Sequence, residues 1–174
     1  MNNIYLVGFM GTGKTAVGQE LAKIKNWRFA DLDELVELKE RMTISDIFGR
    51  KGELWFRRIE RRVLKEVAKE KGFVVACGGG VVLDEDNIKL MKTTGEIICL
   101  TAKPEVILKR VSGTAKRPLL NVPNPKERIE LLLKLRAPYY AKADKTIDTS
   151  KLSVGQVVEK IIKVTSKKSK LSKK

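Results

Sequence analysis

The segment from Gly8 to Thr15 reads GFMGTGKT and matches the phosphate-loop pattern G-x-x-x-x-G-K-[ST] at every fixed position. It lies between an apolar run, Ile4 to Val7, and a helical pattern. In such a loop, backbone N–H groups and the positive end of the following helix face phosphate oxygens. Lys14 would bridge the β- and γ-phosphates, and the Thr15 hydroxyl would bind Mg²⁺. The predicted nucleotide contacts in this segment are Met10, Gly11, Thr12, Gly13, Lys14, Thr15 and Ala16.

A second pattern overlaps this loop. The run Gly11 to Ala16 also fits the relaxed G-x-G-x-x-A dinucleotide fingerprint, and Asp31 follows Gly11 by 20 residues, near the place of a ribose-binding acid. That fingerprint puts its first glycine at the strand end, whereas the strand here ends at Gly8. It also gives the Lys-Thr pair of the loop no purpose. The residues favour a nucleotide phosphate loop over dinucleotide binding or a structural turn.

Two carboxylates, Asp31 and Asp33, follow the second apolar run. Residues two apart on a strand face the same side, so both carboxylates could point into a cleft at the carboxyl edge of a sheet. We expect Asp31 to hold Mg²⁺ through water and Asp33 to bind a substrate hydroxyl. Helix capping is the alternative, because Asp31 with Glu34 three residues later resembles a capping box. One residue can do both.

Several cationic residues are candidates for anion binding. Arg57 opens a helix with four arginines at positions 57, 58, 61 and 62, a cluster that alone fits a solvated face or a nucleic-acid patch. Arg117 lies in the segment 112–125, which has the length of an active-site lid and could fold over phosphates on closure. Arg136, which we expect at the end of its helix, could stabilise the negative helix end or bind an anion.

A run of three glycines, Gly78, Gly79 and Gly80, follows the third apolar strand. Glycines at a strand end expose backbone N–H groups and let a ligand approach closely, although a bare structural turn remains the alternative. The strand itself, Phe73 to Cys77, lacks the acid that a Mg²⁺-binding strand usually carries at its end, and the chain has no N-K-x-D segment for guanine. A small-molecule kinase is therefore favoured over a GTPase or a motor ATPase.

The elements that must position these residues alternate along the chain. Strands are predicted at Ile4–Val7, Trp27–Ala30, Phe73–Cys77, Ile97–Leu100 and near Thr146–Ile147. Helices are predicted after the phosphate loop, at 32–40, 44–49 and 54–69, from Pro104, at 126–136 and at 154–164. The inward positions of the long helix are Leu54, Phe56, Ile59, Val63, Leu64 and Val67. This alternation predicts an α/β fold, with a parallel sheet covered by helices on both faces.

Length and composition limit the possible classes. The 174 residues, 43% hydrophobic and 33% charged, predict one domain over residues 1–164. Six lysines and no acid in the last twelve residues leave +9 of the net charge of +15 on the body, which suits an anionic ligand. We expect the basic tail, 165–174, to be solvated and frayed, because a Lys/Ser run buries too little to become ordered.

Residue types exclude further chemistry. The chain has no histidine, which rules out Ser-His-Asp triads, phosphohistidine relays and His-ligated metal sites. Its two cysteines, Cys77 and Cys99, lie in apolar runs and are expected to be buried free thiols of a reducing cytosol. Neither an export signal nor a spanning apolar stretch is found, so we expect a soluble, cytoplasmic protein without a membrane partner.

Taken together, these segments resemble the shikimate kinase family. The resemblance extends from Ile4 to about Ile162 and leaves out the lysine tail. Its motifs are the phosphate loop, Asp31-x-Asp33, Phe56-Arg57-x-x-Glu60, the triple glycine, Arg117-Pro118-Leu119-Leu120 and Arg136-x-x-x-Tyr140. It implies the fold of nucleoside monophosphate kinases: a three-layer α/β/α arrangement with a five-stranded parallel sheet, a lid and a substrate-binding subdomain around 32–60.

The resemblance also implies the reaction, which is phosphorylation of the 3-hydroxyl of shikimate with MgATP in the pathway to chorismate and the aromatic amino acids. Carried onto this chain, it assigns residues to three groups. The shikimate-binding residues would be Asp33, Arg57, Gly78, Gly79, Gly80 and Arg136. Phosphoryl charge would be neutralised by Lys14 and Arg117, Mg²⁺ would be held by Thr15 and Asp31, and adenine would be covered by Arg110 and bordered by 148–151. The implied partners are shikimate and ATP, and a monomer is the simplest state.

Two other functions stay open at this point. A related small-molecule kinase, such as a gluconate kinase, would use the same phosphate loop on another polyol acid. A basic nucleotide-dependent module would bind nucleic acid through the arginine cluster and the lysine tail, although neither cluster carries the interleaved aromatics of a single-strand platform. The chain departs from the family pattern in its basic tail and in having Lys151, but no arginine, at the adenine rim.

Overall fold

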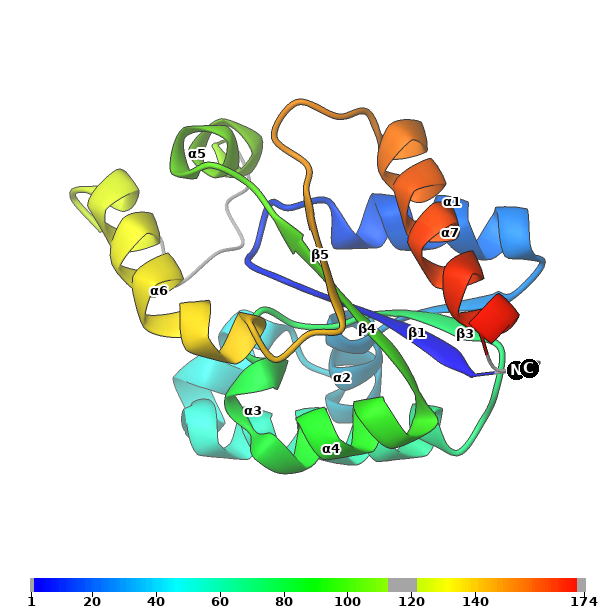
Figure 1. Ribbon diagram of the computed structural model, residues 1–174. Coiled ribbons are helices and arrows are strands. Elements are labelled where there is room, and N and C mark those ends of the chain that lie inside the picture. Colours follow the sequence, from blue (N-terminus) through cyan, green and yellow to red (C-terminus); the bar gives the residue numbers. More distant parts are fainter. Residues whose placement is uncertain (1, 113–121, 172–174) are drawn as a thin grey trace.

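A five-stranded parallel sheet lies between two layers of helices in the computed structural model, which describes residues 2–112 and 122–171 (Figure 1). Its strands, in the spatial order β2-β3-β1-β4-β5, are β1 (Asn3–Val7), β2 (Arg28–Asp31), β3 (Phe73–Ala76), β4 (Gly95–Thr101) and β5 (Lys145–Asp148). All neighbouring strands pair in parallel. The predicted three-layer α/β/α fold is confirmed.

The layers follow from strands that are apolar on both faces. In β1, Ile4 and Leu6 pack with α1 (Lys14–Lys25) and α7 (Val154–Leu171), whereas Tyr5 and Val7 pack on the opposite face. That second face is covered by α2 (Leu32–Glu40), α3 (Ile44–Ala68) and α4 (Glu85–Thr94). Strand β4 alternates in the same way. Because side chains alternate across a strand, an unbroken apolar strand requires helices on both sides.

A smaller apolar cluster joins the phosphate loop to two further helices, α5 (Pro104–Val111) and α6 (Pro125–Tyr140). Phe9 and Met10 of the loop pack there against Ile107 of α5 and Ile129 of α6. In Figure 1, α5 and α6 lie together on one side of the molecule, away from α1 and α7. The loop is thereby held between the main sheet and this helix pair.

Parallel pairing brings three loops to one edge of the sheet. Ala76, the last residue of β3, is in register with Leu6 of β1 and with Asp31 of β2. The chain therefore leaves these three strands side by side, and ligands of parallel sheets bind at this carboxyl edge. The phosphate loop, the acid pair and the triple glycine are neighbours for this reason.

One predicted core position is wrong. The predicted helices 44–49 and 54–69 form a single element, α3, which is interrupted at Gly52 (φ 83°, ψ 169°). Leu54 follows this break and is 88% exposed, so it does not point inward as predicted. The remaining predicted positions, from Phe56 to Val67, all contribute to the core.

The helices differ from the sequence-based prediction at three places: one additional helix and two helix ends. Helix α4 was not predicted, although Asp84 caps it and two acids occupy its first turn. Helix α6 continues through Pro138 to Tyr140, four residues past Arg136. Helix α7 continues to Leu171, past the predicted end at 164, because lysine is a good helix former.

Two further features concern the whole described part of the chain. No helix within residues 2–112 and 122–171 is long and apolar enough to span a membrane. Cys77 and Cys99 are buried and free, as predicted. Burial raises the pKa of Cys99 to about 11 and that of Cys77 well above its ordinary value, so both remain thiols at neutral pH.

Candidate active site

A cavity of about 520 Å³ opens at the carboxyl edge of the sheet. It is bounded by the phosphate loop, by the ends of β2 and β3, and by helices α2, α3 and α6. Ten of the residues predicted for the site line it: Met10, Lys14, Thr15, Asp31, Asp33, Arg57, Gly78, Gly79, Gly80 and Arg136. Segments far apart in the sequence therefore converge on one cavity.

The phosphate loop is held in shape by its own residues. Gly8 has φ 137°, and a Cβ atom there would overlap the carbonyl oxygen of Leu100, so only glycine fits. The buried Thr12 hydroxyl donates to the carbonyl of Phe9 at 2.8 Å. The Lys14 ammonium donates to the carbonyls of Gly8 and Phe9, at 2.9 Å each. A cation and the start of α1 therefore face the centre of the loop.

Thr15 and Asp31 form a pair beside the loop. The Thr15 hydroxyl donates to Oδ2 of Asp31 at 2.8 Å, and Oδ1 of Asp31 accepts from the backbone N–H of Asp33 at 3.0 Å. Hydroxyl and carboxylate oxygens are hard ligands that suit Mg²⁺, which usually takes one or two protein ligands together with phosphates and water. The pair therefore fits the predicted metal.

The acid pair reaches the cavity in a different way from the one predicted. Asp31 is the N-cap of α2, and its capping contact is the N–H of Asp33, so no reciprocal box with Glu34 is needed. Asp33 stands in the first turn of α2 and not on the strand, so the strand-spacing argument is wrong. Both carboxylates nevertheless line the cavity.

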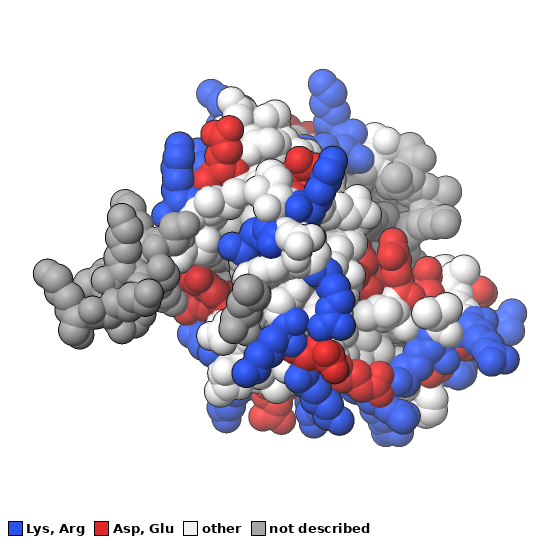
Figure 2. Space-filling view, turned by 90° about the vertical axis from the view of Figure 1, so that its right-hand side faces the viewer, with Lys and Arg blue, Asp and Glu red and all other residues white. Residues whose placement is uncertain are grey.

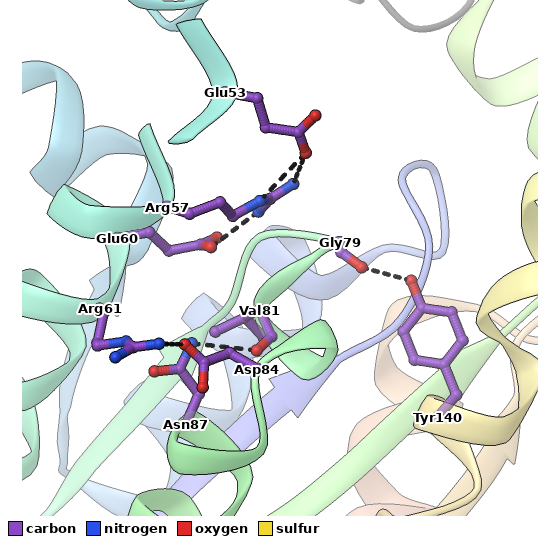
Figure 3. Close-up of polar contacts among 9 residues, drawn as sticks. All are labelled: Glu53, Arg57, Glu60, Arg61, Gly79, Val81, Asp84, Asn87 and Tyr140. Atoms are coloured by element: carbon purple, nitrogen blue, oxygen red, sulfur yellow. Dashed lines mark hydrogen bonds and ion pairs between the residues drawn. The ribbon is translucent and has the colours of Figure 1, made fainter. Parts of the chain in front are cut away.

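Arg57, which is half-buried, and Glu60, which is buried, form an ion pair on α3. Arg57 donates to Oε2 of Glu60 at 2.8 Å and lies within 3.2 Å of Glu53, so that its guanidinium sits between two carboxylates (Figure 3). Glu60 is 1% exposed, and its second oxygen, Oε1, has no partner among the described residues. Burial raises the pKa of Glu60, Arg57 opposes this rise, and the nearby charge of Asp33 adds to it.

The triple glycine runs between these charged groups. A Cβ atom on Gly80 would lie 2.6 Å from the guanidinium carbon of Arg57, and one on Gly78 would lie 2.7 Å from Oε1 of Glu60. Gly79 faces Nη1 of Arg136, 3.4 Å from an ideal Cβ position. A side chain on Gly78 or Gly80 would therefore displace a charged group of the cavity, whereas one on Gly79 would only touch Arg136.

Helix α6 contributes two side chains one turn apart. Arg136 is 8% exposed, and its guanidinium carbon lies 5.6 Å from the ring centre of Phe9. Because α6 runs on to Tyr140, the interpretation of Arg136 as a cap of the helix end is wrong. The Tyr140 hydroxyl donates to the carbonyl of Gly79 at 2.6 Å, and burial raises the pKa of Tyr140 to about 12.

The two remaining predicted cations lie differently. Arg110 donates to the carbonyl of Gly11 at 3.2 Å and to Thr149, through Nη1 at 3.0 Å and Nη2 at 2.9 Å. It thus ties the phosphate loop to the segment after β5. Arg117 lies in 113–121, outside the described residues. Of the predicted lid, Ser112 caps α5 and Pro125 already belongs to α6.

Comparisons with known proteins identify the family of the chain. The shikimate kinase family model matches residues 10–166. The shikimate kinase of Thermoanaerobacter pseudethanolicus is 47% identical over 163 residues, which cover 94% of this chain and 95% of the relative. That of Thermodesulfovibrio yellowstonii is 50% identical over 163 residues and 94% of each chain. The chain belongs to the shikimate kinase family.

Solved structures of shikimate kinases have the same fold. The enzyme from Acinetobacter baumannii, in complex with shikimate, superposes with a TM-score of 0.93 at 38% identity, covering 97% of this chain and 94% of that one. The enzyme from Aquifex aeolicus gives a TM-score of 0.84 at 34% identity, covering 96% and 98%.

Sequence reasoning assigned no role to three residues that hydrogen-bond to predicted site residues. Glu60 and Tyr140 are part of the family motifs, but no role was predicted for either residue. Their signals were present: an acid three residues after Arg57 on a buried helix face, and a tyrosine one turn after Arg136. Thr149, 2% exposed, lies with Oγ1 3.1 Å from the carbonyls of Thr12 and Thr101. No sequence signal indicates that contact.

Proposed function

We propose that this member of the shikimate kinase family transfers the γ-phosphoryl group of MgATP to the 3-hydroxyl of shikimate, giving shikimate 3-phosphate and ADP. The reaction serves chorismate and aromatic amino acid biosynthesis. One observation carries the assignment: the phosphate loop shares its cavity with a carboxylate, two arginines and a glycine turn. An acceptor that has hydroxyls and a carboxylate fits these groups.

The nucleotide side of the cavity would bind and neutralise the phosphates. Residues 10 to 16 would bind ATP, and Lys14, with Arg117 from the lid, would neutralise the transferring phosphoryl group. Mg²⁺, held by Thr15 and through water by Asp31, would balance charge on the β- and γ-phosphates. Arg110 would lie at the adenine.

The acceptor side would bind shikimate through charge and backbone. Arg57 and Arg136 would bind the carboxylate, since a guanidinium matches a carboxylate bidentately. The backbone of Gly78, Gly79 and Gly80 would contact the carboxylate and the ring. Asp33 would hold the 3-hydroxyl and either accept its proton or only orient it, because in a loose transition state the proton leaves late.

Organisation and location are part of the same proposal. Residues 32–60 would form the acceptor-binding subdomain and 112–125 the lid of one domain spanning 1–164. We place the enzyme in the cytoplasm as a monomer. Two buried free thiols suit a reducing compartment.

Nucleic-acid binding is not proposed, because three of the four clustered arginines of α3 are paired with acids. Arg57 pairs with Glu60, Arg61 with Asp84, and Arg62 with Glu66 at 3.5 Å. On the face shown in Figure 2, Lys and Arg are interspersed with Asp and Glu. A phosphate backbone requires a basic surface that is not already neutralised by neighbouring acids.

The test is ADP release from MgATP with shikimate, quinate, gluconate or no acceptor. We expect turnover with shikimate that exceeds the acceptor-free rate by orders of magnitude, and little with quinate or gluconate. Equal stimulation by gluconate would favour the related-kinase alternative. If ATP binds but none of the three acceptors stimulates ADP release, only the assignment of the phosphate loop would remain supported.

A further inference from the structure

The hydrogen bond between Tyr140 and Gly79 joins α6 to the glycine turn. Figure 3 shows the Gly79 carbonyl directed at the Tyr140 hydroxyl, with Arg57 and Glu60 on the other side of the turn. The two residues are 61 positions apart in the sequence, and the oxygens are 2.6 Å apart. This contact therefore depends on how α6 packs against the sheet.

The neighbouring carbonyls of the turn have local partners. Gly78 accepts from the N–H of Val81 at 3.1 Å, and Gly80 accepts from the N–H of Leu83 at 3.0 Å. After the turn, Asn87 donates to the carbonyl of Val81 at 3.1 Å. The middle carbonyl, that of Gly79, is instead held by a side chain from another element.

Holding this carbonyl also fixes the next N–H. The Gly79–Gly80 peptide is trans, as no cis peptide bond occurs among the described residues, so its C=O and N–H point in opposite directions. With the carbonyl directed at Tyr140, the N–H of Gly80 points away from α6. Gly80 lies against the guanidinium of Arg57, and Gly79 against that of Arg136. Two glycines in sequence would otherwise let this peptide rotate freely.

We propose that Tyr140 is a positioning residue for the acceptor: its hydroxyl fixes the Gly79–Gly80 peptide so that the N–H of Gly80 faces the substrate carboxylate. The inference rests on the proposed function, in which that carboxylate lies between Arg57 and Arg136. Without the hydroxyl, the turn would sample other orientations. Only a fraction of the molecules would then have the Gly79–Gly80 peptide in the orientation that binds shikimate, so the apparent affinity for shikimate would fall.

The competing explanation is that Tyr140 only fills space, since it is 8% exposed and packs with the core under the sheet. Its raised pKa means that the hydroxyl remains a proton donor throughout the neutral range. Space filling needs the ring alone, which phenylalanine retains. Positioning needs the hydroxyl. The two explanations therefore predict different results for Tyr140→Phe, which removes only the hydroxyl.

Tyr139→Phe provides a matched control. Tyr139 is the preceding residue of α6, is half-buried against the same core, and has its ring 5.5 Å from Nζ of Lys142 rather than at the turn. The experiment compares wild type, Tyr140→Phe and Tyr139→Phe. It measures KM for shikimate and ATP, and calorimetric Kd values for shikimate and for its methyl ester, which lacks the carboxylate charge.

In Tyr140→Phe we expect KM and Kd for shikimate to rise roughly tenfold, the scale of one lost buried hydrogen bond. The Kd of the ester should rise less than threefold, and KM for ATP and kcat should change less than threefold. Tyr139→Phe should match wild type. An unchanged shikimate Kd, or equal weakening of shikimate and ester, would overturn the inference. Absence of shikimate-dependent turnover in wild type would overturn the proposed function itself, and the inference with it.

Discussion

The phosphate loop and the acceptor wall (Asp33, Arg57, Glu60, the triple glycine and Arg136) face each other across one cavity, yet they are built differently. The loop consists of consecutive residues, and it is closed by internal bonds such as that from Thr12 to Phe9. The wall takes its charged groups from α2, α3 and α6. Its charges balance one another, as Arg57 does with Glu60.

This contrast indicates how sensitive nucleotide binding and acceptor binding should each be to substitutions. A backbone cradle binds phosphate through groups that every sequence possesses, and substitutions in the wall should not disturb it. The wall depends on particular side chains whose buried charges must be paired, so a single change there alters both recognition and stability. Wall variants should therefore affect the acceptor and spare the nucleotide.

The largest effect is expected for Asp33→Asn. Loss of the carboxylate that would hold the 3-hydroxyl should lower kcat by about 10²- to 10⁴-fold. The Kd for MgADP should stay within twofold of wild type, because Asp33 belongs to the wall. Steady-state kinetics and calorimetry measure the two quantities. Glu159→Gln removes the same charge from an exposed position on α7 that does not line the cavity, and should leave kcat nearly unchanged. A large loss of MgADP affinity in Asp33→Asn would contradict the separation.

Arg57→Ala should lower kcat/KM for shikimate by about 30- to 150-fold, or ~2–3 kcal/mol, through loss of a charge-assisted contact. It also leaves Glu60 buried without its cation, so unfolding in urea should begin at lower denaturant concentration. Arg58→Ala serves as the control, since Arg58 is exposed and its guanidinium carbon lies 5.6 Å from the ring of Trp55. Equal kcat/KM values for shikimate in the two arginine variants would contradict a role of Arg57 in binding the acceptor.

Asp31→Asn tests the boundary between the two regions. Asparagine retains an N-cap oxygen for α2 but loses the charge beside Thr15. We expect the Mg²⁺ concentration for half-maximal rate to rise roughly tenfold, with little change in stability. Asp84→Asn alters an N-cap of α4 and should not change the Mg²⁺ requirement. An unaltered requirement in Asp31→Asn would exclude Asp31 from metal binding.

The smallest effect concerns pH. The folded-state pKa of Glu60 is raised by burial, so the folded protein binds an extra proton between the ordinary and the raised pKa. This contribution to stability is complete below the ordinary pKa and is lost as pH rises through the raised one, by at most about 1.4 kcal/mol per pH unit. Glu60→Gln does not titrate, so its stability relative to wild type should increase with pH. Urea unfolding from pH 4 to 8 measures this difference, and a constant or decreasing difference would contradict the pKa direction.

Local and contiguous features were predictable from the sequence. The phosphate loop, the apolar strands and their alternation with helices rest on residues within a few positions of one another. Pro104 begins α5 as predicted, because proline suits the first helical turn. Parallel pairing then brings the three strand ends to one edge.

Features that depend on tertiary packing could not be predicted in the same way. Leu54 fits the apolar period of its helix, but the helix is interrupted at Gly52, and the Leu54 side chain is exposed to solvent. The Arg110–Thr149 and Tyr140–Gly79 contacts join residues 39 and 61 positions apart, which no local pattern reports. Asp33 reached the cavity from a helix and not from a strand, so its position in the cavity was predicted from a wrong local argument.

The most direct test of the proposed function is to identify the phosphorylated atom. Wild-type enzyme would be incubated with MgATP and shikimate, and the product examined by ¹H–³¹P correlation NMR. The account predicts one phosphate ester, coupled to the proton on carbon 3 of shikimate, formed in a one-to-one ratio with ADP. An ester on another hydroxyl, or ADP formed without a shikimate ester, would contradict it.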